Sequence, residues 1–150
     1  MKYNGTVSLN TEPLTVWDVV LDVDRFAACM PGVENLKKLD DRTFEGEMRA
    51  KVGPVSGNFS FQAQIVDSNP PTSLRAVVEG TDSLTNSTMT SEITMELEQT
   101  GQAQTQVAYH AEVNVKGRMG ILGDLVLRAT GAQVIEEFFN RLRKQVEGEA

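Results

Sequence analysis

Apolar and polar residues alternate with a period of two through most of the chain between residues 33 and 115. Turn residues such as Gly53-Pro54 and Asn69-Pro70 divide this pattern into short runs, which is typical of an antiparallel meander. We therefore expect strands over residues 44–52, 59–65, 74–78, 89–97 and 107–115. A chain with so many half-apolar strands must form a sheet and then cover one of its faces.

The two ends of the chain supply elements that can cover this face. Residues 3–9 alternate as a further strand, and Pro13 opens a helical pattern through Trp17 to Leu21. A second helical turn is expected over residues 25–29, and one long helical pattern runs from about residue 119 to 147. Its apolar stripe contains Leu122, Leu125, Ala129, Ala132, Ile135 or Glu136, Phe139, Leu142 and Val146.

These elements together predict an α+β fold. One curved antiparallel sheet would wrap around the long C-terminal helix, with two short helices after the first strand. Because a helix cannot fill the whole concave side of such a sheet, we also expect a cavity between them. The length of 150 residues fits one domain, which we place over residues 1–150.

Composition limits the class of protein. The net charge of −7 argues against nucleic acid as a partner, because nucleic-acid binders need a basic face. The single cysteine, Cys29, and the single histidine, His110, permit neither an internal disulfide nor a Cys/His zinc site. No apolar run has the length of a membrane span or signal peptide. We expect a cytoplasmic protein that meets a membrane at most peripherally, at its inner face.

Candidate catalytic groups are scarce. His110 is on the opposite face of its strand from Tyr109, so alternation turns it to solvent. Neighbouring carboxylates such as Asp22 and Asp24 fit a solvated helix end, and Cys29 fits a buried thiol without activation. We predict no catalytic residue, no metal ligand and no cofactor.

The inward apolar residues are the candidates for a ligand site, since aromatic rings and methionine thioethers suit a flat apolar molecule. Ordinary core packing is an equally good interpretation, and the sequence leaves both open. The opposite wall or entrance of the cavity is assigned to Met30, Ile121, Leu125 and Phe138. The candidate cavity residues are Met30, Phe44, Met48, Phe59, Phe61, Met89, Met95, Tyr109, Ile121, Leu125 and Phe138.

The segment from residue 51 to 57 is a candidate partner-docking loop, because a Gly-Pro turn exposes a stiff surface edge. A plain hairpin turn is the alternative interpretation. The residues assigned to docking are Lys51, Gly53, Pro54 and Gly57.

Several short motifs follow one another along the chain. Val16-Trp17, Asp22-Val23-Asp24 and Met30-Pro31-Gly32-Val33 are followed by the hairpin KVGPVSGNF at residues 51–59. Residues 109–117 then lead to Gly120-Ile121-Leu122-Gly123 and to Glu137-Phe138-Phe139. In this order the motifs resemble the family of the carbon monoxide dehydrogenase G subunit, from Gly5 to Leu142. The predicted arrangement likewise resembles the helix-grip fold of the START and plant-allergen superfamily.

This resemblance implies a non-enzymatic accessory protein that serves a molybdenum hydroxylase. It further implies membrane recruitment of that enzyme and a quinone or lipid-like ligand in the cavity. One alternative is an assembly or docking factor without a bound ligand. The other is an enzyme of the polyketide cyclase or dehydratase kind, which needs a titratable group in the cavity. Tyr109 is the inward candidate for such a group.

Overall fold

The computed structural model describes residues 1–148. Within them, seven strands form one antiparallel sheet in the order β1-β7-β6-β5-β4-β3-β2. The strands are β1 (Lys2–Leu9), β2 (Val33–Asp40), β3 (Thr43–Val52), β4 (Val55–Asn69), β5 (Ser73–Asp82), β6 (Ser87–Gly101) and β7 (Gln104–Lys116). The helices are α1 (Pro13–Leu21), α2 (Val23–Cys29), the short 3-10 helix η1 (Gly120–Leu122) and α3 (Asp124–Val146).

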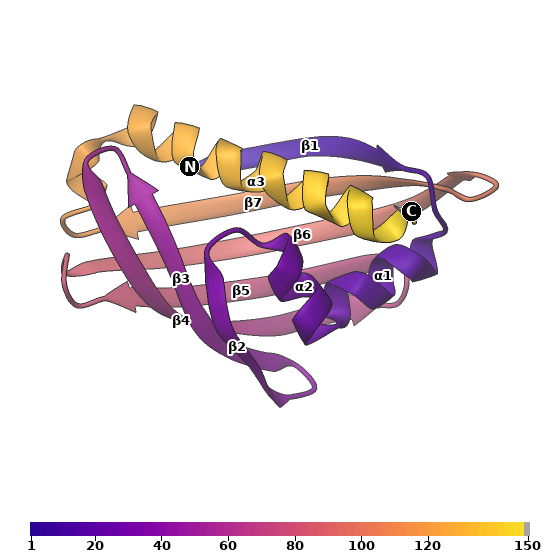
Figure 1. Ribbon diagram of the computed structural model, residues 1–150, viewed down its shortest axis with the longest axis horizontal. Helices are drawn as coiled ribbons and strands as arrows, with labels where there is room; N and C mark the ends of the chain where they lie inside the picture. The colour runs from indigo at the N-terminus through magenta and orange to yellow at the C-terminus, as the bar shows by residue number, and fades with distance from the viewer. Residues whose placement is uncertain (149–150) are drawn as a thin grey trace.

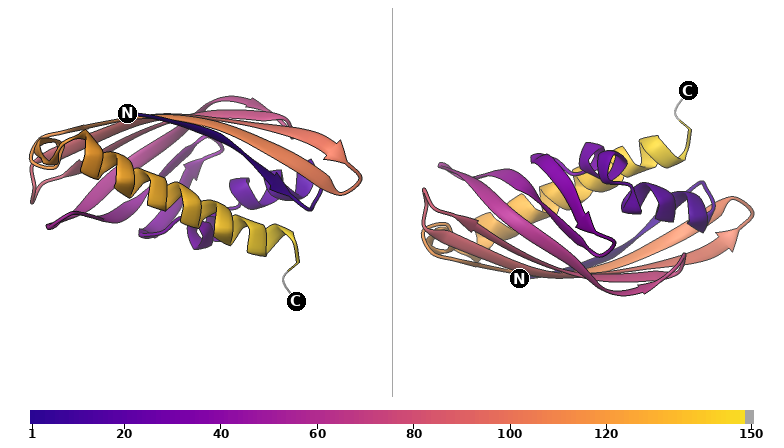
Figure 2. Two further views of the ribbon diagram at one scale, coloured as in Figure 1. Left: turned by 90° about the horizontal axis from the view of Figure 1, so that it is seen from above. Right: turned by 90° about the horizontal axis from the view of Figure 1, so that it is seen from below.

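The sheet is a meander from β2 to β7, to which β1 adds as the outer neighbour of β7. It curves strongly, and α3 crosses its concave side diagonally (Figures 1 and 2). Helices α1 and α2 lie on the same side, near the C-terminal half of α3 (Figure 1). The predicted curved sheet around a C-terminal helix, with two short helices after the first strand, is confirmed.

One residue separates the two short helices. Asp22 follows the last turn of α1, and its carboxylate accepts a hydrogen bond from the backbone N–H of Arg25, 3.1 Å away. Asp22 is therefore the N-cap of α2, which explains why the chain turns there and does not continue as one longer helix.

The buried core divides into two clusters, one at each end of α3. The first joins α1, α2 and the C-terminal half of α3 to one end of the sheet. It contains Leu9, Val16, Trp17, Val19, Cys29, Met95, Leu97, Val107, Phe139, Leu142 and Val146. The second lies under the N-terminal end of α3 and contains Val52, Phe59, Met119 and Leu127.

The C-terminal helical pattern differs from the prediction at its beginning. Gly123 has a φ of 90° and interrupts the helix, so η1 and α3 replace one helix from residue 119. The break changes which residues face the sheet: Leu127 is buried, whereas Leu125 is 85% exposed. The C-terminal half of the expected stripe is confirmed, because Phe139, Leu142 and Val146 are buried.

Strand β2 was not among the predicted strands. Most of its residues are exposed, and its pairing with β3 shifts register twice. It is an edge strand with little buried surface, so it has no regular alternation to reveal it.

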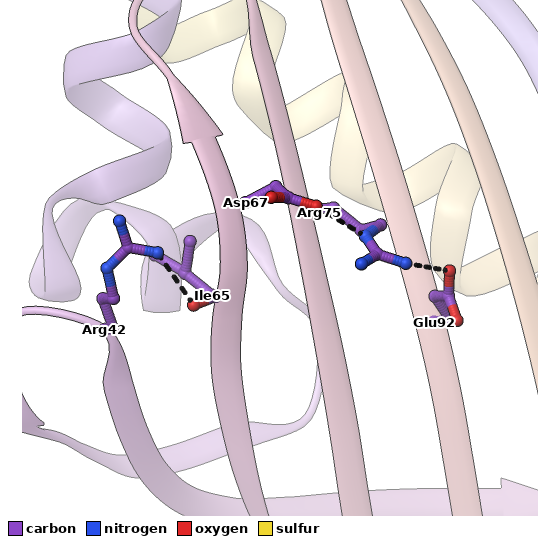
Figure 3. A network of polar contacts seen from close by, with 5 residues as sticks. All are labelled: Arg42, Ile65, Asp67, Arg75 and Glu92. Carbon is purple, nitrogen blue, oxygen red and sulfur yellow. Dashed lines mark hydrogen bonds and ion pairs between the residues drawn. The ribbon is translucent and has the colours of Figure 1, made fainter.

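The convex face of the sheet is polar. Figure 3 shows Arg75 on β5 between Asp67 on β4 and Glu92 on β6, at 3.1 Å from each carboxylate. All three side chains are substantially exposed, so these ion pairs contribute little to stability. The face that carries apolar residues is therefore the concave one, against α3.

Candidate functional site

The centre of the concave face is not filled by the core. Ile93 points to this face, in the same alternation as the buried Met95, yet its side chain is 37% exposed. Its partners across the sheet are Ala76 on β5 and Ala111 on β7, both small. In the next row Ala63 pairs with Val78, and Val78 pairs with Ser91. Small residues thus flank both Ile93 and Val78, and the Ile93 side chain stays partly exposed above the middle of the sheet.

Six of the predicted cavity residues belong to neither core cluster, and two of these, Ile121 and Leu125, are exposed. Met30, Phe44, Met48 and Phe61 are all half-buried. Phe61 lies between two glycines: a Cβ at Gly46 would be 3.2 Å from the Phe61 ring, and one at Gly80 would be 3.3 Å from the Phe61 Cβ. The end of the Phe61 ring therefore lies beside Gly46, where it can form part of an apolar wall.

The other inward candidates take part in the core. Phe59 and Met95 are buried in the two clusters, and Met89 packs against the cluster that contains Phe59. Tyr109 packs on Phe139, with ring centroids 5.1 Å apart. Phe138 contacts Phe139 and Phe26, with centroid distances of 5.2 and 5.7 Å. These residues bound the open centre at its ends.

Two predicted entrance residues lie on the surface. Ile121 and Leu125 are 84% and 85% exposed, so neither packs against the concave face. The expectation for Leu125 assumed one continuous helix, and the break at Gly123 turns it outward. Leu84, in the β5–β6 turn, is a third strongly exposed apolar residue, at 86%.

The turns at this end of the sheet gather around the start of α3, and we call the group of residues Pro54, Leu84, Ile121 and Leu125 the apolar tip. The predicted hairpin turn at Gly53-Pro54 is confirmed, and a Cβ at Gly53 would be 3.5 Å from Val126. A Cβ at Gly57 would meet the Met119 side chain and lie 2.9 Å from Asp82. Lys51 and Pro54 are exposed. The candidate docking loop is thus one of three adjacent turns.

Two surface grooves flank α3. One of about 460 Å³ lies between α3 and the edge of β3, and is lined by Gly32, Ala50 and Val134 among others. The other, of about 580 Å³, lies between α3 and β1, above Val7, Tyr109 and Phe139. The helix therefore spans the concave face without sealing either side of it.

Polar chemistry at the open centre is sparse. The inner face carries Ser91, and the Tyr109 phenol lies near its β1 side, where a Cβ at Gly5 would be 2.8 Å from the hydroxyl. His110 is exposed on the opposite face, as predicted. Between residues 1 and 148, no group of His, Cys, Asp and Glu side chains is arranged to hold a metal ion.

None of the helices in residues 1–148 combines the length and apolar character needed to cross a membrane.

Alternation along residues 89–97 puts Ile93 on the same face as Met89 and Met95, but Ile93 is not among the candidate cavity residues that the sequence suggests. The available signal was the set of small residues Ala63, Ala76, Ser91 and Ala111 on neighbouring strands. Their significance depends on strand register, which places them on either side of Ile93 and Val78 only in the folded sheet.

Comparison with known proteins identifies the family. The model of the family of the carbon monoxide dehydrogenase G subunit (CoxG) matches residues 5–147. The chain belongs to the CoxG family. No curated protein matches its sequence significantly.

Solved structures show how this CoxG-family chain folds. A conserved protein from Geobacillus kaustophilus superposes with a TM-score of 0.90 at 20% identity, over 98% of this chain and 95% of that one. A START superfamily protein from Mycobacterium smegmatis gives 0.72 at 13% identity, over 99% of both chains. A protein from Thermus thermophilus gives 0.72 at 14% identity, over 100% and 99%. These similarities show that the chain shares the fold of these proteins, and the predicted helix-grip fold is confirmed.

Proposed function

We propose that this protein is a non-enzymatic accessory protein that holds a quinone or lipid-like molecule against the concave face of its sheet. The exposure of Ile93 carries this proposal, because solvent reaches an aliphatic side chain on the face that α3 covers. A flat apolar ligand would remove this surface from water, with a gain of roughly 25 cal/mol per Å² buried. The half-buried rings of Phe44 and Phe61 supply a wall that suits such a ligand.

The same surroundings favour carriage over catalysis. An enzyme of the cyclase or dehydratase kind needs a titratable group that reaches the bound molecule. The positions beside Ile93 are Ala76 and Ala111, and the Tyr109 phenol lies at the margin against Phe139. A carrier needs only apolar area and shape, which these residues offer.

Binding of a short-chain quinone, measured by calorimetry and native mass spectrometry, tests the proposal. We expect a dissociation constant in the micromolar range or below, about −8 kcal/mol. Ile93→Trp should fill the space and abolish binding, whereas Thr90→Trp, on the exposed convex face of the same strand, should not. An absence of saturable binding would overturn the carrier function and favour the alternative of a docking factor without a ligand. Chemical conversion of the bound quinone, abolished by Tyr109→Phe, would favour the enzyme.

We further propose that the protein serves a molybdenum hydroxylase and contacts it through the loop at Lys51, Gly53, Pro54 and Gly57. Membership of the CoxG family supports the partner, and three exposed aliphatic side chains beside this loop support the surface. Co-purification with a carbon monoxide dehydrogenase should be lost in Leu84→Ser. Leu39→Ser is the control, because Leu39 is also an exposed leucine, at 50%. It lies on β2 beside the first residues of β3, whereas the proposed docking loop starts at the end of β3. Equal retention by both variants would exclude this surface.

A further inference from the structure

Strand β1 leaves an open edge along the groove beside α3. Met1 and Val113 exchange backbone hydrogen bonds of 2.7 and 2.8 Å, so odd-numbered residues of this segment point their backbone groups to β7. The even-numbered residues of β1 therefore point theirs outward. As an edge strand it can accept a further strand.

Two arginines of α3 occupy the ends of this edge. Arg128 donates to the carbonyl of Lys2 at 3.2 Å, and Arg143 donates to the carbonyl of Ser8 at 3.1 Å. Fifteen helical residues span about 22 Å and six strand residues about 20 Å, so helix and strand run alongside each other. The left view of Figure 2 shows α3 and β1 running alongside each other.

The middle of the edge is free. Within residues 1–148, the outward backbone groups of Asn4 and Thr6 have no backbone partner. The groove beneath them is apolar at Val7, Ile135 and Phe139. A lipid tail laid here would leave the exposed N–H and C=O groups unpaired, whereas an extended peptide would pair them.

The charge of the groove indicates the kind of peptide. The groove is lined by three basic residues, Lys2, Arg128 and Arg143. Among the described residues that line it, Glu136 carries the one carboxylate. This local excess of positive charge contrasts with the net charge of −7 for the whole protein. Carboxylates at the two ends of a bound segment would meet the two arginines.

We propose that β1 and α3 together bind an extended segment of a partner protein, which adds to the sheet as an eighth strand beside β1. The segment has acidic side chains about six residues apart and apolar side chains between them on the same face. Its backbone pairs with Asn4 and Thr6, and its apolar side chains pack on Ile135 and Phe139. This interaction is independent of the proposed ligand on the concave face.

The test is a titration of the whole protein with the peptide acetyl-Glu-Ser-Val-Ser-Val-Ser-Glu-amide, monitored by proton–nitrogen correlation NMR. We expect saturable shifts of the Asn4 and Thr6 amides, with a dissociation constant on the order of 0.1 mM, and slower hydrogen exchange at both. A peptide with lysine at both ends, or with N-methylated edge-facing amides, should bind at least tenfold more weakly. No shift of these amides at millimolar peptide overturns the proposal.

Matched variants test the edge and the arginines separately. Thr6→Pro removes an outward N–H that makes no bond to β7, and should weaken binding at least tenfold, whereas Thr6→Val keeps the N–H and should not. If Thr6→Pro does not fold, Arg128→Gln with Arg143→Gln gives the second readout, a loss of the preference for acidic ends. Binding unchanged in these variants overturns the proposal. If the protein forms a dimer that Thr6→Pro dissociates, the proposal is also overturned, because the strand that pairs with β1 would then come from a second copy of this chain.

Discussion

The carboxylate of Asp82 accepts a hydrogen bond from the backbone N–H of Asn58, 3.3 Å away on the neighbouring strand. It also accepts from the Leu84 N–H at 3.0 Å and from the Thr85 hydroxyl at 2.9 Å. Asp82 is 3% exposed, so this is a buried carboxylate held by three donors. It fixes the β5–β6 turn that carries Leu84, part of the apolar tip.

We expect acid to weaken the fold through Asp82. Burial alone would raise the pKa of this carboxyl, but hydrogen bonds from Thr85, Leu84 and Asn58 together lower it below its usual 3.8. A lowered pKa stabilises the folded state above the unfolded-state pKa, and the contribution is lost as pH falls through the folded-state pKa. Urea unfolding should therefore show falling stability below about pH 4. Asp82→Asn should be less stable at pH 7 by about 1–3 kcal/mol and should show a smaller loss in acid.

Asp41→Asn is the control for this prediction. The Asp41 carboxylate is fully exposed and lies 3.5 Å from the Lys38 ammonium, so its replacement should leave the urea unfolding midpoint at pH 7 almost unchanged. If Asp82→Asn kept the full loss of stability in acid, another carboxylate would be responsible.

Gly117 and Gly123 allow backbone conformation to be separated from contact. Both have φ near +90°, at 89° and 90°. A Cβ at Gly117 would meet the Asn86 carbonyl oxygen and lie 2.7 Å from the Ser87 Cα, whereas a Cβ at Gly123 would have nothing within 4 Å. Gly123→Ala should thus cost only the backbone strain, about 1–3 kcal/mol, and Gly117→Ala clearly more, above about 3 kcal/mol. Equal unfolding midpoints in urea for the two variants would contradict this interpretation of the Gly117 contacts.

The strands and their faces could be predicted because alternation depends on adjacent residues alone. Phe59, Met95 and His110 lie on the faces expected for them. The open centre could not be predicted, because it depends on Ala76 and Ala111 standing on either side of Ile93. That arrangement follows from strand register, which the chain sets only when the sheet forms.

The beginning of α3 shows a second limit. Leu122 and Leu125 continue the helical spacing of the later stripe, so periodicity alone extends the helix to residue 119. The positive φ of Gly123 ends that continuity, and Leu127 takes the buried position. A glycine in a helical pattern can either continue the helix or interrupt it. Here the backbone N–H of Met119 donates to the Ser87 hydroxyl at the start of β6, 3.0 Å away, and this contact holds the segment before the break.

Alanine substitutions measure this difference in register directly. Leu127 is 8% exposed in the second core cluster, and Leu127→Ala should cost about 2–4 kcal/mol. Leu125 is 85% exposed, so Leu125→Ala should change stability by less than about 0.5 kcal/mol. Chemical unfolding of the two variants provides the measurement. A large loss of stability in Leu125→Ala would instead support one continuous helix from residue 119.

The thiol of Cys29 should react slowly in the folded protein. Cys29 is fully buried in the first core cluster, and burial raises its pKa against the lowering effects of Arg141, Gln145 and Arg25. Its sulfur also accepts a hydrogen bond from the Gln145 amide at 3.1 Å. Because the thiolate is the reactive form, modification by an aromatic disulfide at pH 8 should be roughly 100-fold slower than in denaturant. Since reagent reaches the thiol only when α2 opens from α3, adding urea below the unfolding midpoint should speed the reaction. A native rate equal to the denatured one would show that this end of the core is already open.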